Sequence, residues 1–503
     1  MYLILTASSD TYITNKILNN SYRVTDANVG NASTLDLFKL YAESTIKNET
    51  NPIELSRILI KFDYDKLRSL TGSNLDIAHS SFKCYLKMSD VYGGQTVPSN
   101  FKVQVFPLSK SFDEGPGRDI VTFADLGGVN FITASVSGDT AIAWDATGSN
   151  AQGLLGSDDI DIIASGNLND GNGIINLWQQ QLFETGEEDL SIDITTLVSA
   201  SLKDIIPDCG FRISFSGSHE TDSKSRFVKR FASRHTQQSN LRPKIVVTYD
   251  DSTVDHIGMF EFDVTGSIFL NNYQRGVPKN ILSGSAATEI TGSDSLLVTL
   301  TSGSFSKVIT GSQHTIGSKY IDGFYSASFA ISQYESSLRG EVVSAASASF
   351  KTLWGSLDGS IGYHTGSLII KNQNRGSSGQ SPNRLYLNVT NLKSTYFNDQ
   401  KVIFRTFIEN TSRELKALKL PFESKSEVFE SVFYQVRDVN SDKIIIPFHK
   451  NGTKLSSDAD GMYFKLDMSS LYGGVYVFDF QISDLGVDRV FTAASAKFRV
   501  DEK

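Results

Sequence analysis

The sequence predicts an all-β protein built from several β-sandwich domains in series. Its 503 residues include 39 Gly but only 10 Pro, together with 32 Phe and 19 Tyr. Glycine supplies tight turns, and aromatic side chains pack well on the pleated surface of a sheet. Short runs with an apolar residue at every second position also recur along the chain, bounded by Gly, Ser, Asn and Asp. A chain of this length accommodates about three or four domains.

Composition and charge argue against several classes of protein. The chain is 40% hydrophobic and 20% charged, which is the balance of a globular protein. Its net charge of −9 speaks against a nucleic-acid carrier, so we expect no direct contact with nucleic acid. No apolar run reaches the ~20 residues of a membrane span, and the opening MYLILTASSD lacks the basic residues of a signal peptide.

Two cysteines, Cys84 and Cys209, are too few for a disulfide scaffold or a Cys-ligated zinc site. Cys84 stands inside the strand-like run FKCYLKM, where we expect a buried free thiol.

Residues 1–252 are predicted to form one large β-domain. Its strands are expected in residues 1–15, 28–41, 56–64, 82–88, 101–108 and 211–249. The Gly- and Asp-rich segment 115–188 is expected to be loop-like, with short strands or helices around Phe131 and Trp178. Within 191–202 the apolar spacing changes from two toward about 3.6 residues, which predicts a short helical turn.

Six blocks of this domain occur in an order that resembles a known family. They are DTYI, NVGNASTLDL, SRILIKFD, DITTLV, FASRHT and RPKIVVTY, at residues 10–13, 28–37, 56–63, 193–198, 231–236 and 242–249. Together they resemble the DNRLRE-type domain, a jelly-roll β-sandwich related to carbohydrate-binding modules and found on cell surfaces. The segment 109–190 is longer than the family pattern, and FASR stands where an aromatic residue usually precedes the Ser-Arg pair. The resemblance implies a jelly roll.

Residues 253–380 are predicted to form a Gly/Ser-rich β-sandwich, because Gly-Ser pairs recur between short apolar runs such as SLLVTL and SLIIK. This segment resembles the β-modules of bacteriophage tail and baseplate proteins. The tract NQNRGSSGQSPN, residues 372–383, is the expected linker. Residues 381–503 contain seven strand-like runs, the number expected of an immunoglobulin-like sandwich.

The sequence contains none of the catalytic motifs G-x-S-x-G, H-E-x-x-H or the phosphate-binding loop. The pair His219-Glu220 with Asp222 is interpreted as the tip of a polar hairpin rather than an acid–base site. Acidic clusters at Asp158, Asp159 and Asp161, and more weakly at Asp458 and Asp460, are candidates for a structural calcium ion, since Ca²⁺ takes several oxygen ligands. No other cofactor is expected.

A cluster of cations contrasts with the acidic chain. Between Thr221 and Lys244 the one acid is Asp222. If the cations share a face, they form a docking surface for an acidic partner; alternatively, alternation turns some of them inward and Arg234 pairs internally. The candidate interface residues are Lys224, Arg226, Lys229, Arg230, Arg242 and Lys244. Candidate sugar-stacking aromatics are Tyr92, Trp144 and Trp178, which could equally be core residues.

These observations predict a non-enzymatic structural protein of a bacteriophage virion: a tail, baseplate or neck component assembled in the host cytoplasm. We expect its partners to be other virion proteins, with homo-oligomers in a symmetric assembly and a host glycan as a further ligand. The alternative is a carbohydrate-binding adhesin or host-surface module. A polysaccharide-degrading enzyme is the third hypothesis, although no motif supports it.

Overall fold

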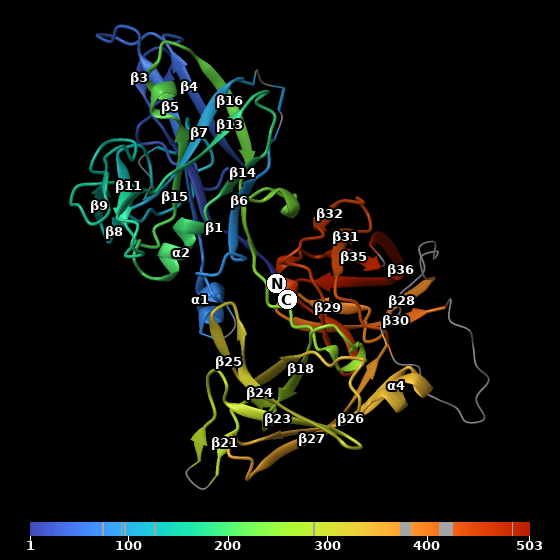
Figure 1. Ribbon diagram of the computed structural model, residues 1–503. Coiled ribbons are helices and arrows are strands. Elements are labelled where there is room, and N and C mark those ends of the chain that lie inside the picture. The colour runs from blue at the N-terminus through green and yellow to red at the C-terminus, as the bar shows by residue number, and fades with distance from the viewer. Residues whose placement is uncertain are drawn as a thin grey trace. The chain divides into compact units, whose positions relative to one another are not determined.

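The computed structural model describes residues 1–72, 75–91, 93–94, 97–124, 127–284, 287–372, 384–411, 426–484 and 486–503 (Figure 1). It divides the chain into two compact units. The N-terminal unit comprises Leu3–Leu70 and Phe82–Thr248, and the C-terminal unit comprises Met1–Tyr2, Thr71–Ser81 and Tyr249–Lys503. The expected linker, residues 372–383, lies almost wholly outside the described residues. The division into three domains stays a prediction.

A ten-stranded sheet forms the framework of the N-terminal unit, and it confirms the expected β-sandwich class. Eight strands follow the order β13-β7-β15-β5-β1-β17-β6-β14, and β4 joins β5 to β16. Their bounds are β1 Tyr2–Thr14, β4 Thr34–Tyr41, β5 Ile53–Phe62, β6 Lys83–Met88, β7 Phe101–Pro107, β13 Gln179–Phe183, β14 Leu190–Asp193, β15 Phe211–Phe215, β16 Arg226–Ala232 and β17 Lys244–Thr248.

Most strands that pair in this sheet come from distant parts of the sequence, so they cannot form their hydrogen bonds locally. The last strand of the unit, β17, pairs antiparallel with β6, and Val247 stands opposite Cys84. Cys84 is fully buried and free, as expected. Small sheets in the segment expected to be loop-like share a core with β1, β5 and β7 of this framework. Their strands are β8 Thr133–Ser137, β9 Thr140–Ala143, β10 Gln152–Leu154, β11 Ile162–Asn167 and β12 Ile174–Asn176. That segment therefore carries more regular structure than its Gly content suggested.

The expected helical turn is present as α2, Thr195–Leu202, directly after β14. Further helices were not foreseen: α1 Asp65–Thr71, α3 Gly217–Thr221 and α4 Arg339–Ala345. Helix α3 contains His219 and Glu220, which corrects the hairpin tip expected there. The Glu220 carboxylate forms two hydrogen bonds with Arg57, at 3.1 and 2.7 Å, and this tertiary pair holds the short helix against the sheet.

The middle part of the chain is a sandwich in which a six-stranded sheet folds over one core. The strand order is β18-β25-β24-β23-β26-β27. Alternate residues of β23, such as Leu296, Val298 and Leu300, are fully buried in the core that they share with Phe350 and Trp354. The strands are β18 Gly266–Asn271, β23 Leu296–Ser302, β24 Phe305–Ile316, β25 Lys319–Phe329, β26 Ser347–Gly355 and β27 Gly362–Lys371.

The last part of the chain consists of two sheets with an aromatic core between them. Phe404 and Phe464 of one sheet contact Phe478 of the other, with ring centres 4.9 and 5.2 Å away. One sheet contains β28 Leu385–Val389, β30 Lys401–Asn410, β34 Gly461–Asp467 and β33 Ser456–Asp458. The other contains β29 Thr395–Phe397, β36 Val487–Asp501, β35 Gly474–Asp484, β31 Val432–Asp438 and β32 Ile444–Ile446. The arrangement is that of an immunoglobulin-like sandwich.

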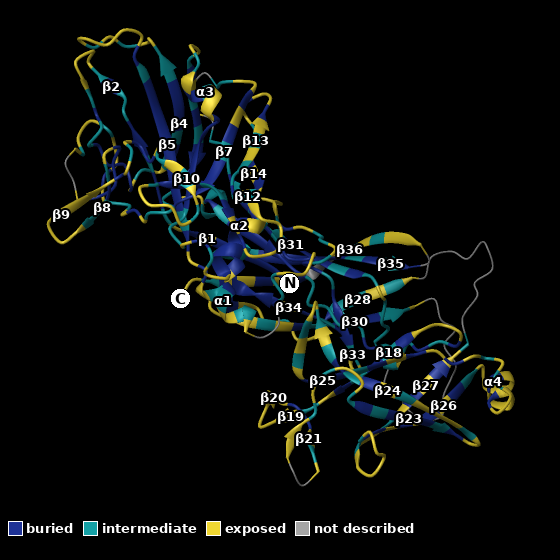
Figure 2. Cartoon of the chain, turned by 60° about the vertical axis from the view of Figure 1, so that its left-hand side comes forward, coloured by how far each residue is buried: buried dark blue, intermediate teal, exposed yellow. Residues whose placement is uncertain are grey.

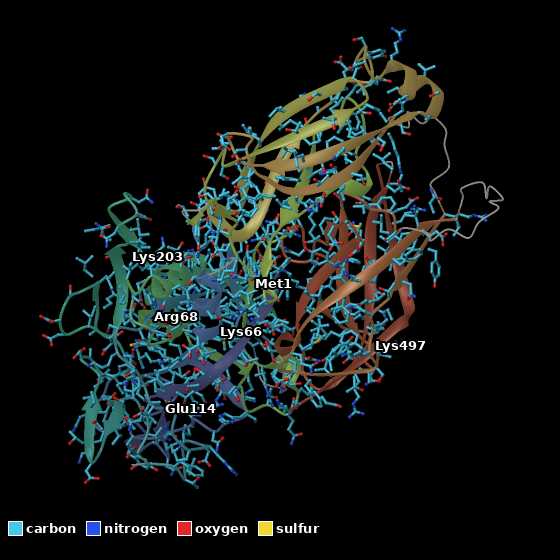
Figure 3. The ribbon with its side chains drawn as sticks, turned by 90° about the horizontal axis from the view of Figure 1, so that it is seen from below. Met1, Lys66, Arg68, Glu114, Lys203 and Lys497 are labelled. Atoms are coloured by element: carbon cyan, nitrogen blue, oxygen red, sulfur yellow. The ribbon has the colours of Figure 1, made fainter. Side chains whose placement is uncertain are left out.

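Short elements complete the described chain. Two-residue ladders are formed by β2 Ile17–Leu18 with β3 Tyr22–Arg23, β19 Tyr273–Gln274 with β20 Val277–Pro278, and β21 Leu282–Ser283 with β22 Thr288–Glu289. Single 3₁₀ turns occupy η1 Ser239–Leu241, η2 His256–Gly258 and η3 Met468–Ser470. The amino group of Met1, labelled in Figure 3, donates to Asp251 Oδ1 at 2.6 Å and to the Tyr249 carbonyl at 2.5 Å. The first residue is thus bound to the chain segment that begins the C-terminal unit.

Candidate functional site

The structure places two of the predicted interface cations inside the N-terminal unit. Lys229 has no exposed side-chain surface, and its ammonium lies 2.5 Å from Asp90 Oδ1 and donates to the carbonyls of Gly186 and Glu188. Arg226 is also buried and is bound through two hydrogen bonds to Asp222, at 2.8 and 2.7 Å. Simple alternation would place residues three apart on opposite faces, but the pairing of β16 with β4 shifts register between Arg226 and Lys229, and both side chains are buried. The expectation that they belong to an exposed docking surface is therefore wrong.

The remaining predicted interface cations are half-buried or exposed, and most of them also have partners. Arg230 forms two hydrogen bonds with Asp36, at 2.7 and 2.8 Å. Arg242 donates to the Thr236 carbonyl, and Lys244 donates to the Asn240 carbonyl at 3.2 Å. Lys224 is exposed. A contact role for these four stays a prediction, but they do not form the unpaired positive face that their sequence clustering suggested.

The carboxylates predicted as calcium ligands do not gather around a common point. Asp161 is fully buried, and its carboxylate accepts backbone N–H groups from Asp145, Ala146 and Ala151 at 2.8 to 3.0 Å. Asp158 and Asp159 are exposed. Because three N–H donors already satisfy the Asp161 oxygens, no shared set of oxygen ligands forms at this position. In the weaker candidate, Asp458 is bound by Arg405 at 2.9 and 2.7 Å and closes the turn to Asp460.

The predicted sugar-stacking aromatics are core residues where the structure describes them. Trp144 is buried, and its indole N–H donates to the Asn130 carbonyl at 3.0 Å. Trp178 packs against the same core, with its ring centre 6.3 Å from that of Phe106. Tyr92 lies outside the described residues.

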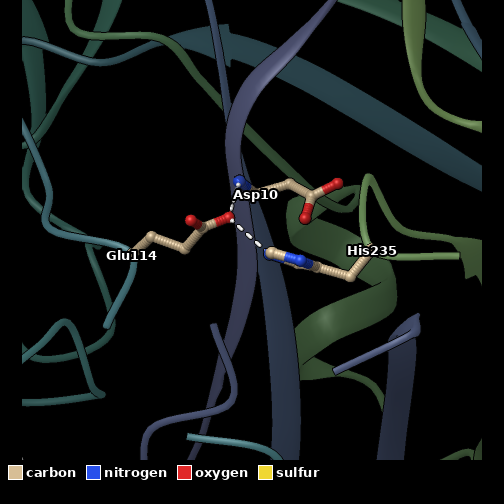
Figure 4. Close-up of side chains that lie close together, drawn as sticks. All are labelled: Asp10, Glu114 and His235. Carbon is tan, nitrogen blue, oxygen red and sulfur yellow. Dashed lines mark hydrogen bonds and ion pairs between the residues drawn. The ribbon is translucent and has the colours of Figure 1, made fainter. Parts of the chain in front are cut away.

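Among the described residues, one group of potential metal ligands comes together: Asp10, Glu114 and His235 (Figure 4). One ligand atom from each lies within 4.8 Å of the others. Glu114 Oε1 accepts the backbone N–H of Asp10 at 2.9 Å and lies 3.3 Å from His235 Nε2. Asp10 stands on β1 and His235 follows β16, in two blocks of the family resemblance. Glu114 lies in the segment that the resemblance does not cover, so no sequence pattern pointed to it.

Arg234 already provides positive charge to this cluster. Its guanidinium binds both oxygens of Glu114, at 2.6 and 2.5 Å, and its backbone N–H donates to Asp10 Oδ2 at 2.6 Å. This is the internal pairing of Arg234 that the sequence offered as an alternative. A divalent ion could bind these ligands only by competing with Arg234 for Glu114, so we interpret the cluster as a link between three chain segments.

Asp10 is the unusual member of the cluster. Its side chain is fully buried, and Oδ1 has no hydrogen-bond partner in the described part of the chain. Burial raises the pKa of Asp10 to about 7, and the charge of Glu114 adds to this against the opposing effect of Arg234. The cluster can therefore hold a proton close to neutral pH.

A different candidate surface lies on the C-terminal unit, where the strands β24, β23, β26 and β27 turn alternate residues outward (Figure 2). We call these outward rows the Ser/Thr face. They are Ser306, Val308 and Thr310; Leu297, Thr299 and Thr301; Ser347, Ser349, Lys351 and Leu353; and Thr365, Ser367, Ile369 and Lys371. These rows contain two lysines and no carboxylate. Val308, Leu353 and Ile369 are 57%, 40% and 51% exposed.

The strand β27 forms the open edge of the Ser/Thr face. It pairs along its length with β26, and it stands at the end of the sheet order. One side of its backbone is consequently available to another strand up to Ile370, whereas Lys371 is already hydrogen-bonded on that side to Phe260 and Phe262.

Comparisons with known proteins do not assign the chain to a family. The chain matches no protein-family model and no curated protein. Among solved structures, tandem Ig repeats of Dlar align with 51% of this chain and 96% of their own at 7% identity, with a TM-score of 0.14. The native conformation of E. coli alpha-2-macroglobulin aligns with 99% of this chain and 30% of its own at 9% identity, with a TM-score of 0.13. These scores carry no argument about function. In the described part of the chain, no helix is long and apolar enough to cross a membrane.

Proposed function

We propose that the chain is a non-enzymatic structural component of a bacteriophage particle, such as a tail, baseplate or neck protein, and that it assembles through β-domain contacts. The observation that carries this proposal is the Ser/Thr face, a broad exposed sheet surface with few charges on a chain that is 20% charged. Its expected occupant is a second copy of the chain in the particle.

Electrostatics favours this face for contact between copies. Two molecules that each carry a net charge of −9 repel one another wherever their acidic surfaces meet. The Ser/Thr face has no carboxylate, so two copies approach there without desolvating acids. Burying aliphatic side chains such as Val308, Leu353 and Ile369 contributes about 25 cal/mol for each Å² removed from water.

The edge strand β27 supplies specificity to the same contact. Pairing of β27 with a strand of its neighbour would satisfy the open backbone groups and align the two faces. The free cysteines fit assembly in a reducing cytoplasm, where disulfides rarely persist.

The test is to locate the chain in purified particles from infected cells, by mass spectrometry of the particles and immunogold electron microscopy. The proposal expects a fixed copy number at one position in the particle. Absence of the chain from purified particles refutes it.

Variants then test the surface. Leu353→Glu combined with Ile369→Glu should abolish incorporation into particles while circular dichroism remains that of the wild type. Val490→Glu is the matched control, because Val490 is 60% exposed on β36, outside the Ser/Thr face. Normal incorporation of the double variant would exclude this face as the assembly contact.

A further inference from the structure

A cavity of about 550 Å³ lies within the C-terminal unit. Outward residues of β18, β24 and β25 form one wall, including Phe269, His314 and Phe324. Outward residues of β30 and β34 form the other, including Arg405 and Tyr463. The volume falls in the range of about 300–1,000 Å³ that is typical of small-molecule sites.

Aromatic rings dominate the first wall. The Phe269 ring centre lies 4.8 Å from that of His314, and the Tyr273 ring centre lies 6.2 Å from that of Phe324. Tyr273 and Tyr320 line the same cavity with 55% and 46% of their surfaces exposed. The cavity thus presents exposed aromatic surface to a ligand, whereas aromatic residues of a satisfied core would be covered.

Hydrogen-bonding groups of both kinds stand around these rings. Asp458 is fixed by two hydrogen bonds from Arg405, and Asp255 is 7% exposed with its Oδ1 accepting the N–H of Ile257 at 3.0 Å. Burial, with the nearby charge of Asp458, raises the pKa of Asp255 to about 6. Asn271 and Lys465 add an amide and an ammonium to the lining.

We propose that this cavity binds a neutral saccharide, with sugar rings stacked on Tyr273 and Tyr320 and hydroxyl groups bound by Asp458, Arg405 and Asn271. A sugar hydroxyl both donates and accepts hydrogen bonds, so it matches a lining that offers carboxylates beside guanidinium and amide groups. The C–H faces of a sugar supply the apolar surface that exposed aromatic rings can cover. This site belongs to the C-terminal unit, whereas the sequence led us to expect a glycan on the jelly-roll-like segment.

Other ligand classes fit the lining less well. The lining also holds the cations Lys319, Arg405 and Lys465, but a phosphate group would meet the carboxylates of Asp251, Asp255, Asp322 and Asp458 as well, and these repel anions. A wholly apolar ligand would remove these carboxylates from water without giving them partners, which is costly. A neutral molecule rich in hydroxyl groups avoids both penalties.

The experiment uses the full chain and an array of neutral oligosaccharides built from glucose, galactose, mannose and N-acetylglucosamine, followed by calorimetric titration of any sugar that binds. Inorganic phosphate is titrated in parallel. We expect Tyr273→Ala and Tyr320→Ala each to weaken sugar binding about tenfold or more, because each removes a stacking surface. Tyr273→Phe should retain binding, since the ring remains.

Tyr334→Ala is the matched control, because Tyr334 is 74% exposed and lies outside the cavity lining. Both tyrosines to be replaced are substantially exposed, so their variants should fold, which circular dichroism checks. The proposal is overturned if no neutral sugar on the array binds, if phosphate binds in its place, or if binding survives removal of both rings. Particle incorporation is measured separately: a chain that enters particles but binds no sugar refutes this site and leaves the proposed function standing.

Discussion

Replacing Asp10 with Asn tests whether this buried carboxyl group of strand β1 holds a proton in the native protein. Asp10 has no exposed surface, and the charged and titratable groups that face it are Glu114, Arg234 and His235. Asn keeps the size of the side chain and an oxygen that can accept the Arg234 backbone N–H, now 2.6 Å from Asp10 Oδ2. The substitution therefore removes the titration with little change in packing.

The expected magnitude follows from the raised pKa. The pKa of Asp10 moves from 3.8 to about 7, so the native state binds the proton more tightly than the unfolded state. The stabilisation is complete below pH 3.8 and is lost as the pH rises through about 7. One pKa unit corresponds to about 1.4 kcal/mol, so between about pH 5 and pH 9 this group alone should lower the free energy of unfolding by about 3 kcal/mol.

Hydrogen exchange measured by mass spectrometry on peptides that cover β1 and β5 gives this free energy locally. We expect the wild-type free energy of opening to fall relative to that of Asp10→Asn as the pH is raised. Asp158→Asn is the control, because Asp158 is exposed and the same chemical change there should leave the pH dependence unaltered. Parallel curves for the wild type and Asp10→Asn from about pH 5 to pH 9 would refute the reasoning.

Three further predictions concern the interior. Lys229→Met should lower the free energy of unfolding by about 3–5 kcal/mol in urea titrations, because it leaves Asp90 without the cation 2.5 Å away; an unchanged midpoint would contradict this. Gly30→Ala should lower the melting temperature measured by calorimetry sharply, because a Cβ there would lie 1.9 Å from the Glu114 carbonyl oxygen. Gly127→Ala is the control: a Cβ at that position would have no atom within 4 Å, so the melting temperature should not change. Cys84 should resist iodoacetamide until the protein unfolds, since burial raises the pKa of its thiol; mass spectrometry showing rapid labelling of native Cys84 would contradict this.

Strands with clear alternation were predictable from sequence because one face of each is buried. In β23 the buried and half-buried residues alternate without interruption from Leu296 to Ser302, and the apolar run SLLVTL shows the same period. The strand β26 has the same period, with Ala348, Phe350 and Trp354 buried, but the polar residues between them and the Ser residues at its start obscured the pattern. Helix α3 had no local signal, because the Glu220–Arg57 pair that holds it joins residues 163 positions apart.

The candidate sites depended on pairings that sequence cannot reveal. The run of cations from Lys224 to Lys244 has a single acid among its neighbours in sequence, which made it look like a positive surface. In the folded chain Lys229 meets Asp90 from 139 positions away, and Arg234 meets Glu114 from 120 positions away. Such partners come from other strands and loops, so local charge counting overestimates exposed charge in a β-sandwich.

These pairings also bear on where the chain makes contacts. In the N-terminal unit, Arg226, Lys229, Arg230 and Arg234 each bind a carboxylate of the same unit, so little of their charge remains to attract a partner. An acidic partner would have to displace the carboxylate from such a pair to bind the cation through the same groups, and this cost cancels much of the gain. The Ser/Thr face carries hydroxyl and aliphatic groups in place of paired charges, so contact there breaks no ion pair. The proposed assembly surface is therefore the Ser/Thr face, which carries few charged side chains, rather than the segment from Lys224 to Lys244 in which the sequence concentrates cations.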